Sequence, residues 1–505
     1  MPATMNTPET TAIDSHSQTG QGGTQSSVAR HWIDGAWHDG GKVEDSHSPS
    51  TGKVLGRFCS AGADEARVAI AAARKAFDTS VWAKDRDLRF RALNELADRI
   101  EEKREVLART LALENGKILA QATFEAGTAA PTLRYYAGLA LTDAGTASEV
   151  QPGIFFQTLQ EPIGVAGIII PWNSPVALLG RSLAPALAAG CTVVVKMPGQ
   201  TGLTNGLFNE AVAATTTLPR GIVNIFTESC NEGAQLLVES SDVDAINYTG
   251  SAKVGRIIAA NGGKTLKRMV LELGGKTPMI VFEDADLDAI APLLVRGLTT
   301  FNGQFCMTGS RVLAARGIAD DLRARLTELI RKVKVGPSDD PSSEMGPVID
   351  KANVARIERF VAEAEAYAKV LVRGGPVTEG PLAAGAFYRP SLLEVEDVNV
   401  PLVQQEVFGP VLCFEVFNDE ADAIRRANAT EYGLGASIFT RDVARSYRVA
   451  RELKAGTVWT NSWAVINPRF EEGGFKQSGI GRLRGSQGME VFQETKTYVH
   501  VASAK

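Results

Sequence analysis

Short apolar runs that alternate with amphipathic stretches, from about residue 160 onward, constrain the fold of this chain most strongly. Buried strands are predicted at 165–170, 192–195, 222–226 and 245–248. Short, nearly continuous apolar runs are typical of parallel strands that are covered on both faces, and a helix is predicted between them at 201–214. A second series starts with a strand at 278–282 and continues through helices at 286–300 and 320–333. We therefore predict an α/β fold with two stacked, doubly wound domains.

The N-terminal part of the chain differs in composition from the rest. Residues 1–28 are rich in Thr, Ser, Gly and Gln, which predicts a disordered tail. Residues 32–37 contain an Asp-Gly pair between apolar residues and are predicted to form a hairpin. Helices are predicted at 64–77 and at 87–115, and Gly116 is the stop signal of the second helix.

Composition excludes several classes of function. The 505 residues are 44% hydrophobic and 22% charged, with a formal net charge of -5, so the chain lacks the basic field of a nucleic-acid-binding protein. No apolar run reaches the length of a membrane span, and no basic segment precedes Arg30. The five cysteines show no CxxC spacing, which argues against disulfides and against a zinc or other metal site. We expect a cytoplasmic protein.

Cys306 lies in the segment Phe301–Arg311, and the chain has no histidine between His47 and His500. A cysteine nucleophile usually relies on a histidine base. Here the base must be a carboxylate or a lysine, and Glu272 is the natural candidate because apolar residues and glycines flank it. A thiol with a carboxylate and no imidazole indicates covalent redox chemistry on a carbonyl rather than hydrolysis.

The first domain has no GxGxxG motif. Residues 262–265 resemble part of a phosphate-binding P-loop, but Ile258 stands where that loop needs glycine. A better candidate is the turn at Gly250, after which Ser251 begins a helix whose N-terminal N–H groups suit a pyrophosphate. The alternative is an ordinary strand-to-helix turn.

Asn173 follows the strand at 165–170 and is expected at the carboxyl end of the sheet, where α/β enzymes bind ligands. Its amide is a candidate donor to an oxyanion. The alternative is that the Asn173 side chain makes an Asx-turn that caps the next helix.

Several motifs occur together in one order, and together they resemble the NAD(P)-dependent aldehyde dehydrogenase superfamily. The resemblance covers the chain from about residue 31 onward and rests on residues 171–175, 195–196, 248–255, 271–276, 301–311, 406–410 and 473–481. Several motifs in a fixed order are far more specific than any one of them.

The resemblance implies a mechanism and three catalytic residues. Cys306 attacks the aldehyde as a thiolate, which the surrounding charges or dipoles are expected to favour. Asn173 and the backbone N–H of Cys306 hold the resulting oxyanion. Glu272 then activates the water that hydrolyses the thioester, which favours release of a carboxylic acid over transfer to coenzyme A. The alternatives are a domain-interface ion pair for Glu272 and an inert packing role for Cys306.

The resemblance also implies NAD or NADP as the coenzyme. Lys196 matches a contact to the adenosine ribose or phosphate region, Gly250 and Ser251 match the pyrophosphate turn, and Glu406 and Phe408 match the nicotinamide end. The full set expected to bind the coenzyme is Ile170, Pro171, Trp172, Lys196, Gly199, Gly250, Ser251, Leu273, Glu406 and Phe408. Many NAD-preferring members have glutamate at the position of Gly199. A glycine neither recruits the ribose 2'-hydroxyl nor repels a 2'-phosphate, so this position does not select between the coenzymes, and NAD is favoured on family frequency alone.

A substrate pocket is expected at Ser174, Arg181, Phe305, Met307, Trp463 and Glu472. Ser174, Arg181 and Glu472 stand at positions that are often aromatic in the family. Our hypothesis is that Arg181, Trp463 and Glu472 accept a polar or aromatic aldehyde rather than a long alkyl chain. The alternative for Arg181 is a solvated helix residue.

The resemblance divides the chain into a coenzyme-binding domain, a catalytic domain and a small β oligomerisation arm. The expected ranges are 29–143 and 163–275 for the first, 276–482 for the second, and 144–162 and 483–505 for the arm. The arm is expected to extend a neighbouring subunit's sheet in a homodimer or homotetramer. An intrachain hairpin is the alternative, and neither a nucleic acid nor a membrane is an expected partner.

Two other functions would need only some of these residues. A thiol esterase would use the nucleophile without hydride transfer, and a non-catalytic cofactor-binding protein would keep the fold alone. Aldehyde-dependent absorbance at 340 nm separates both from a dehydrogenase.

Overall fold

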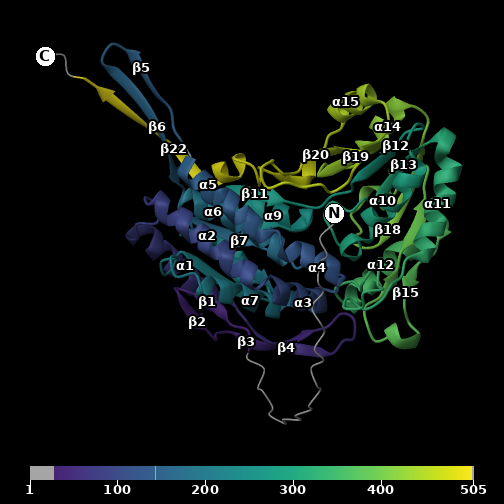
Figure 1. The fold of residues 1–505 in the computed structure, drawn as a ribbon, viewed down its shortest axis with the longest axis horizontal. Coiled ribbons are helices and arrows are strands. Elements are labelled where there is room, and N and C mark those ends of the chain that lie inside the picture. The colour runs from purple at the N-terminus through teal and green to yellow at the C-terminus, as the bar shows by residue number, and fades with distance from the viewer. Residues whose placement is uncertain (1–27, 143, 503–505) are drawn as a thin grey trace, which may run out of the picture.

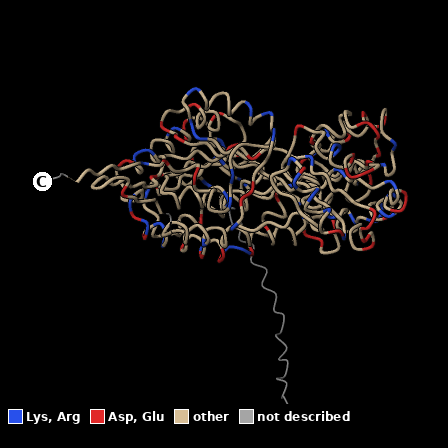
Figure 2. Tube along the Cα trace, turned by 90° about the horizontal axis from the view of Figure 1, so that it is seen from above, with Lys and Arg blue, Asp and Glu red and all other residues tan. Residues whose placement is uncertain are grey.

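A computed structural model describes residues 28–142 and 144–502 and confirms the predicted α/β class. Two α/β lobes lie side by side, and a narrow β arm projects from the first lobe (Figure 1). Basic and acidic residues are interspersed over both lobes (Figure 2). Within the described ranges, none of the helices has both the length and the apolarity that crossing a bilayer requires. The predicted tail lies, apart from Val28, outside the described residues.

The first lobe contains an eight-stranded sheet in the described part of the chain. Its order is β2 (Ala36–His38), β1 (His31–Ile33), β9 (Val223–Glu228), β8 (Thr192–Pro198), β7 (Val165–Ile169), β10 (Ala245–Thr249), β11 (Arg268–Glu272) and β21 (Gly479–Ile480). The four strands predicted in this region are β7 to β10, and they lie side by side and parallel. Their carboxyl ends therefore share one edge of the sheet.

Alternate residues of these strands pack on opposite faces. In β7, Ala166 and Ile168 join one core, and Val165 and Ile169 join another. The first core is covered by α2 (Arg86–Glu102), α5 (Ala129–Thr142), α6 (Pro175–Ala189) and α7 (Gly202–Ala213), and the second by α1 (Ala63–Thr79), α8 (Glu232–Glu239) and α9 (Ala252–Gly262). Burial on both faces explains why the strands are apolar throughout rather than alternating.

The long helix predicted at 87–115 is two helices. Helix α2 ends at Glu102, and α3 (Arg104–Asn115) starts after Lys103, which has φ −96° and ψ 1°. The apolar residues at helical spacing stop at Ile100 and resume at Leu107, and the charged residues between them have no core contact that would keep the helix straight. The break lets α3 pack against α7 and α4 (Leu119–Ala126).

The second lobe is built on a seven-stranded sheet in the described part of the chain. Its order is β14 (Lys369–Val372), β17 (Ser391–Glu394), β18 (Val411–Phe417), β13 (Arg311–Ala315), β12 (Pro278–Val281), β19 (Gly435–Phe439) and β20 (Thr457–Thr460). The two predicted helices are α10 (Leu287–Thr299) and α11 (Ala319–Lys332), which cover one face. The other face is covered by α12 (Lys351–Ala364), α13 (Pro401–Gln404), α14 (Glu420–Ala427) and α15 (Val443–Glu452).

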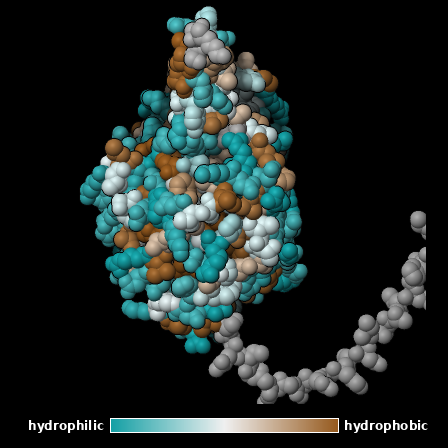
Figure 3. Space-filling view, turned by 90° about the vertical axis from the view of Figure 1, so that its left-hand side faces the viewer, coloured by the Kyte–Doolittle hydropathy of each residue, from teal (hydrophilic) through white to brown (hydrophobic). Residues whose placement is uncertain are grey.

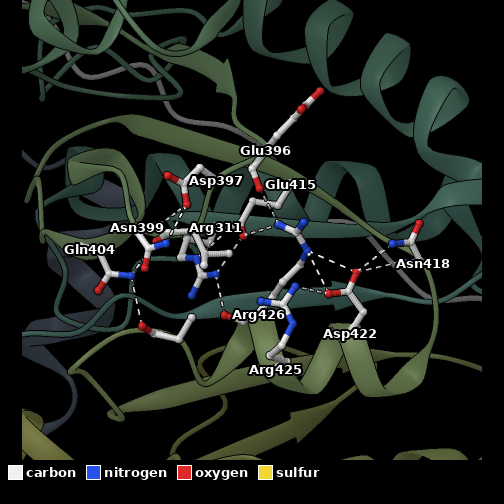
Figure 4. Close-up of polar contacts among 12 residues, drawn as sticks. Arg311, Glu396, Asp397, Asn399, Gln404, Glu415, Asn418, Asp422, Arg425 and Arg426 are labelled. Atoms are coloured by element: carbon white, nitrogen blue, oxygen red, sulfur yellow. Dashed lines mark hydrogen bonds and ion pairs between the residues drawn. The ribbon is translucent and has the colours of Figure 1, made fainter.

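A buried ion pair fixes the start of β13, the strand that follows the Cys306 segment. Arg311 donates to both carboxylate oxygens of Glu415 on β18, at 2.7 and 3.1 Å, and to the carbonyl oxygen of Arg426 at 2.9 Å (Figure 4). Both side chains are fully buried. A bidentate arginine–carboxylate pair has a defined geometry, so it sets the register of two neighbouring strands.

The C-terminal segment returns to the first lobe, which changes one predicted domain boundary. Strand β21 pairs with β11 of the first sheet, although residues up to 482 were expected to belong to the catalytic domain. Leu271 faces Ile480, and Glu272 faces Gly479. The second lobe is therefore tied to the first at the strand that carries Glu272.

The arm is a three-stranded sheet. The strand predicted at 148–160 is a hairpin of β5 (Ala147–Gln151) and β6 (Ile154–Pro162), and β22 (Gln493–Val501) pairs with β6 along its whole length. The intrachain alternative is thus present within one chain. Apolar residues are visible on the arm in Figure 3. The exposed apolar side chains of the arm include Phe155, Phe156, Val499 and Val501.

Candidate active site

A cavity of about 880 Å³ lies along the carboxyl edge of the first sheet. Nearly all residues predicted to bind the coenzyme line it, namely Ile170, Pro171, Trp172, Lys196, Gly250, Ser251, Leu273, Glu406 and Phe408. Asn173, Glu272 and Cys306 line the same cavity. Residues from both lobes, more than 200 positions apart in sequence, therefore meet at one site.

The Cys306 segment has an irregular backbone before the cysteine. Phe301, Asn302 and Gly303 have φ angles of +51°, +60° and +74°, and a Cβ at Gly303 would lie 2.4 Å from the backbone carbon of Gly409. Asn302 donates to the Pro347 carbonyl oxygen at 2.7 Å, which anchors this turn. Neighbouring segments of the same chain thus hold the loop in a backbone conformation that few residues other than glycine adopt.

Burial raises the pKa of the Cys306 thiol well above its usual value, and the carboxylates of Glu472 and Glu272 raise it further. Arg181 acts in the opposite direction. We expected the surrounding charges to favour the thiolate. The side chains of the protein do not provide that environment, because burial and negative neighbours both disfavour an anion on sulfur.

Glu272 ends β11, where it pairs with Thr249 of β10 on one side and with Gly479 of β21 on the other. Its Oε2 lies 3.8 Å from a guanidinium nitrogen of Arg181, and its Oε1 has no hydrogen-bond partner among the described residues. Burial raises the pKa of Glu272 to about 8, and Arg181 opposes this shift. Glu272 therefore forms an ion pair, as the alternative interpretation expected. It also has one carboxylate oxygen without a hydrogen-bond partner among the described residues, and it lines the cavity.

The Asn173 side chain is directed toward the Cys306 segment. Its Nδ2 donates to the Gln304 carbonyl oxygen at 3.1 Å. The first N–H groups of α6 are bound instead by Glu125, whose Oε1 accepts from Val176 at 3.0 Å. The Asx-turn alternative is therefore wrong. An amide nitrogen carries two hydrogens, so one N–H of Asn173 remains for a ligand.

Lys117 and Glu125 are site residues that the sequence interpretation missed. Their side chains form a fully buried ion pair, and Lys117 also donates to the Asn173 carbonyl oxygen at 2.7 Å. The Lys117 Nζ lies 3.8 Å from the ring centroid of Phe301. The available signal was two ionisable residues eight positions apart in a mostly apolar stretch, which does not by itself identify a pair.

The turn after β10 has the predicted form. A Cβ at Gly250 would lie 2.2 Å from the Tyr248 hydroxyl, so any larger residue there would require the Tyr248 ring to move. Ser251 is the N-cap of α9 and accepts from the Val254 N–H at 3.4 Å. The Lys196 side chain is mostly buried at the same edge, and burial lowers its pKa.

The opposite end of the cavity is formed by the second lobe. Glu406 accepts from the Gly275 N–H at 3.1 Å, and burial raises its pKa to about 7. Phe408 meets Trp172 edge to face, with ring centroids 5.7 Å apart. Arg356 donates to the Val407 and Phe408 carbonyl oxygens at 2.6 and 3.2 Å, which fixes this loop.

Gly199 is the one predicted coenzyme residue that does not line the cavity. A Cβ there would lie 2.1 Å from the Ser229 hydroxyl, so a glutamate side chain has no room at this position. The cavity wall nearby contains Glu228 and Ser229, which the sequence interpretation missed. Glu228 ends β9 and accepts from the N–H groups of Gly233 and Ala234, at 2.6 and 3.1 Å.

The predicted substrate residues fall into two groups. Phe305, Met307 and Trp463 surround Cys306, and the Trp463 indole donates to the Met307 carbonyl oxygen at 2.8 Å. Arg181 and Glu472 instead form a buried ion pair at 2.8 Å. The solvated alternative for Arg181 is wrong, because its side chain is only 1% exposed.

The structure does not support the hypothesis that Arg181 and Glu472 bind a polar aldehyde. None of the six predicted substrate residues lines the 880 Å³ cavity. Ser174 is buried and is the N-cap of α6 without a side-chain capping bond. The charges of Arg181 and Glu472 neutralise each other, so neither is a free polar group for an aldehyde.

Comparison with known proteins identifies the family. The family model described as "Aldehyde dehydrogenase family" matches residues 37–498. The chain belongs to the aldehyde dehydrogenase family. Among curated relatives, an aldehyde dehydrogenase of Aspergillus niger is 37% identical over 92% of this chain and 93% of its own length. The 2-aminomuconic semialdehyde dehydrogenase of Homo sapiens is 34% identical over 93% and 97%.

Solved structures agree with this membership. A betaine aldehyde dehydrogenase of Staphylococcus aureus in complex with NAD⁺ superposes with a TM-score of 0.92 at 33% identity, covering 95% of this chain and 96% of that one. A putative aldehyde dehydrogenase of Burkholderia cenocepacia gives 0.90 at 34% identity, covering 94% and 97%. This member of the aldehyde dehydrogenase family is accordingly an oxidoreductase.

Proposed function

We propose that this aldehyde dehydrogenase uses NAD(P)⁺ to oxidise an aldehyde to a carboxylic acid through a thioester on Cys306. The observation that carries the proposal is that Cys306, Glu272 and Asn173, from three separate motifs, line one cavity with the candidate coenzyme residues. A thiol esterase would not need the candidate coenzyme residues. The carboxylate at Glu272 supports hydrolysis as the final step.

The cavity fits a dinucleotide. Its volume of about 880 Å³ is within the range of small-molecule sites. The N-terminus of α9 offers N–H groups for a pyrophosphate, Lys196 offers a cation, and Glu406 offers a carboxylate for ribose hydroxyls. When bound, the nicotinamide supplies a positive charge and the acceptor for the hydride.

The first half of the reaction forms the thioester. Glu272, with a pKa near 8, accepts the thiol proton of Cys306, and the sulfur adds to the carbonyl carbon. The carbonyl oxygen becomes an oxyanion that the free N–H of Asn173 binds. This oxygen then re-forms the C=O bond as the carbon gives up its hydride. One such donor lowers the barrier by about 3 kcal/mol.

The second half releases the acid. Glu272 first releases to solvent the proton that it took from Cys306. Its carboxylate then takes a proton from water, the hydroxide adds to the thioester carbon, and the C–S bond breaks. The electron pair of that bond stays on sulfur, and Cys306 takes up a proton again. For each aldehyde, one water is consumed, one carboxylic acid and one reduced coenzyme are formed, and one proton is released.

We propose NAD over NADP because of Glu228. Its carboxylate is buried beside Lys196 in the cavity wall and occupies the N–H groups at the start of α8. A 2'-phosphate placed near Lys196 would meet this negative charge, and it would find the α8 donors already taken. The ratio of kcat/KM for the two coenzymes tests this, and a preference for NADP would contradict it.

We propose that the aldehyde is aromatic or conjugated. Phe301, Phe305 and Trp463 form consecutive edge-to-face contacts beside Cys306, with centroid separations of 5.4 and 5.9 Å. Rigid aromatic walls suit a flat substrate better than a flexible chain. A clear preference for long n-alkanals over benzaldehydes and unsaturated semialdehydes would contradict this.

We also propose a homodimer or homotetramer formed through the arm. Among the described residues, β5 pairs only with β6, which leaves its other edge open, and the arm exposes apolar side chains that a neighbouring subunit would cover. Light scattering of the intact chain, compared with a chain truncated before β22, tests this. The five cysteines are all unpaired, which supports a reducing compartment such as the cytoplasm, and cell fractionation tests that assignment.

The central experiment is a panel of aldehydes assayed at 340 nm with NAD and with NADP. Benzaldehydes, semialdehydes, betaine aldehyde and n-alkanals cover the substrate classes. Cys306→Ala is the control and is expected to lose all aldehyde-dependent absorbance. Full turnover by this variant would disprove the nucleophile assignment.

A further inference from the structure

A cluster of four charged side chains lies behind the base of the proposed reaction. It consists of Arg181, Glu272, Glu472 and Arg484, whose side chains are 1%, 4%, 7% and 11% exposed. Arg181 donates to Glu472 at 2.8 Å and to the Thr249 hydroxyl at 2.7 Å. Arg484 donates to the other Glu472 oxygen at 2.5 Å.

We propose that Arg181 and Glu472 are positioning residues that set the pH range in which Glu272 activates water. This inference rests on the proposed role of Glu272 as the base. Neither residue lines the coenzyme cavity, so both act through the Glu272 carboxylate.

Arg181 interacts differently with its hydrogen-bond partners than with Glu272. The guanidinium is hydrogen-bonded to Glu472 and Thr249, so its position is fixed from two sides. Its separation from Glu272 Oε2 is 3.8 Å, which is too long for a hydrogen bond. Arg181 therefore acts on Glu272 as a fixed charge, and it leaves the carboxylate free to accept a proton from water.

The cluster is electrically balanced only when Glu272 is ionised. Two guanidinium groups, which remain protonated in proteins, then face two carboxylates. The other groups around Glu272 are Arg482, from the same C-terminal segment as Arg484, and the thiol of Cys306. Its strand neighbours Thr249 and Gly479 carry no charge.

This arrangement predicts opposite effects for the two positioning residues. Removing the charge of Arg181 removes a cation that favours the Glu272 carboxylate, so a higher pH is needed to form the base. Removing the charge of Glu472 removes an anion that disfavours it, so a lower pH suffices. A charge at this separation shifts a titration by about one pH unit or more.

The test measures hydrolysis of a preformed acyl-enzyme, because acylation blocks Cys306 and its own titration cannot contribute. The full-length protein is acylated with p-nitrophenyl acetate, and loss of the acetyl group is followed by mass spectrometry from pH 6 to 10. In Arg181→Met the inflection is expected to move up by about one unit, which slows hydrolysis at pH 7 about tenfold. In Glu472→Gln it is expected to move down.

Two further variants separate the possible failures. Arg181→Lys keeps the charge and is expected to restore most of the inflection, whether or not Arg181→Met folds. Shifts of Arg181→Met and Glu472→Gln in the same direction, no shift in either of these two variants, or a shift in Arg181→Lys as large as in Arg181→Met would overturn the inference. Glu272→Gln tests the proposed function separately, because hydrolysis as fast as in the unmodified protein would show that Glu272 is not the base.

Discussion

The Lys117–Glu125 pair allows a test of how the site is supported. Both side chains are fully buried, Lys117 binds the Asn173 carbonyl oxygen, and Glu125 binds the first N–H groups of α6. Replacing Lys117 with Met leaves the Glu125 carboxylate buried without its cation. Breaking such a pair costs about 3–5 kcal/mol, a large part of the free energy of unfolding of a typical domain.

The double variant Lys117→Met/Glu125→Gln separates the charge from the packing. No charge remains, and the Gln amide oxygen can still accept from the Val176 N–H. Removing both ions of a buried pair is often close to neutral, so most of the lost stability is expected to return. The midpoint temperature should fall by about 6–20 °C in the single variant and recover in the double variant.

The assay is thermal unfolding followed by circular dichroism at one subunit concentration, with kcat/KM measured in parallel. Arg109→Met is the matched control, because Arg109 on α3 pairs with Glu105 at 3.0 Å but both side chains are largely exposed. It should change stability by less than about 1 kcal/mol. Equal midpoint temperatures for Lys117→Met and the double variant would refute the reasoning.

Four more predictions follow from the site. Cys306→Ala should abolish NADH formation while NAD still quenches intrinsic fluorescence, and residual turnover would contradict this. Asn173→Ala should lower kcat/KM about 100-fold with little change in coenzyme affinity, because one oxyanion donor of about 3 kcal/mol is lost. Glu228→Gln should raise kcat/KM with NADP relative to NAD, and an unchanged ratio would argue against its role. Because the pKa of Glu272 is near 8 and its carboxylate is the active form, kcat should rise as pH increases from 7 to 9, and a falling profile would count against it.

Local sequence patterns predicted most of the elements that build the site. The strands β7 to β10 were predicted because burial on both faces produces a short apolar run in the sequence. The helices α10 and α11 were predicted because burial of one helical face produces apolar residues at helical spacing. Motif order indicated the family, which the comparisons show. The break at Lys103 was missed because the helical spacing continues on both sides of it.

Side-chain pairing was decided by the tertiary structure alone. Glu472 lies 291 positions from Arg181 in sequence, and no local pattern relates them. The same holds for Asn173 and Gln304, and for Arg311 and Glu415. From the sequence, Arg181 was interpreted as a substrate contact or a solvated residue and Glu472 as a substrate contact, and only the fold shows that they neutralise each other.

The sequence by itself determined the fold class and the candidate nucleophile, base and amide, because periodicity and residue chemistry are local properties. The tertiary structure decided the environment of those groups: a raised pKa at Cys306, a fixed guanidinium behind Glu272, and a carboxylate at Glu228. The reason is physical, since burial and charge proximity depend on distances between residues that are remote along the chain.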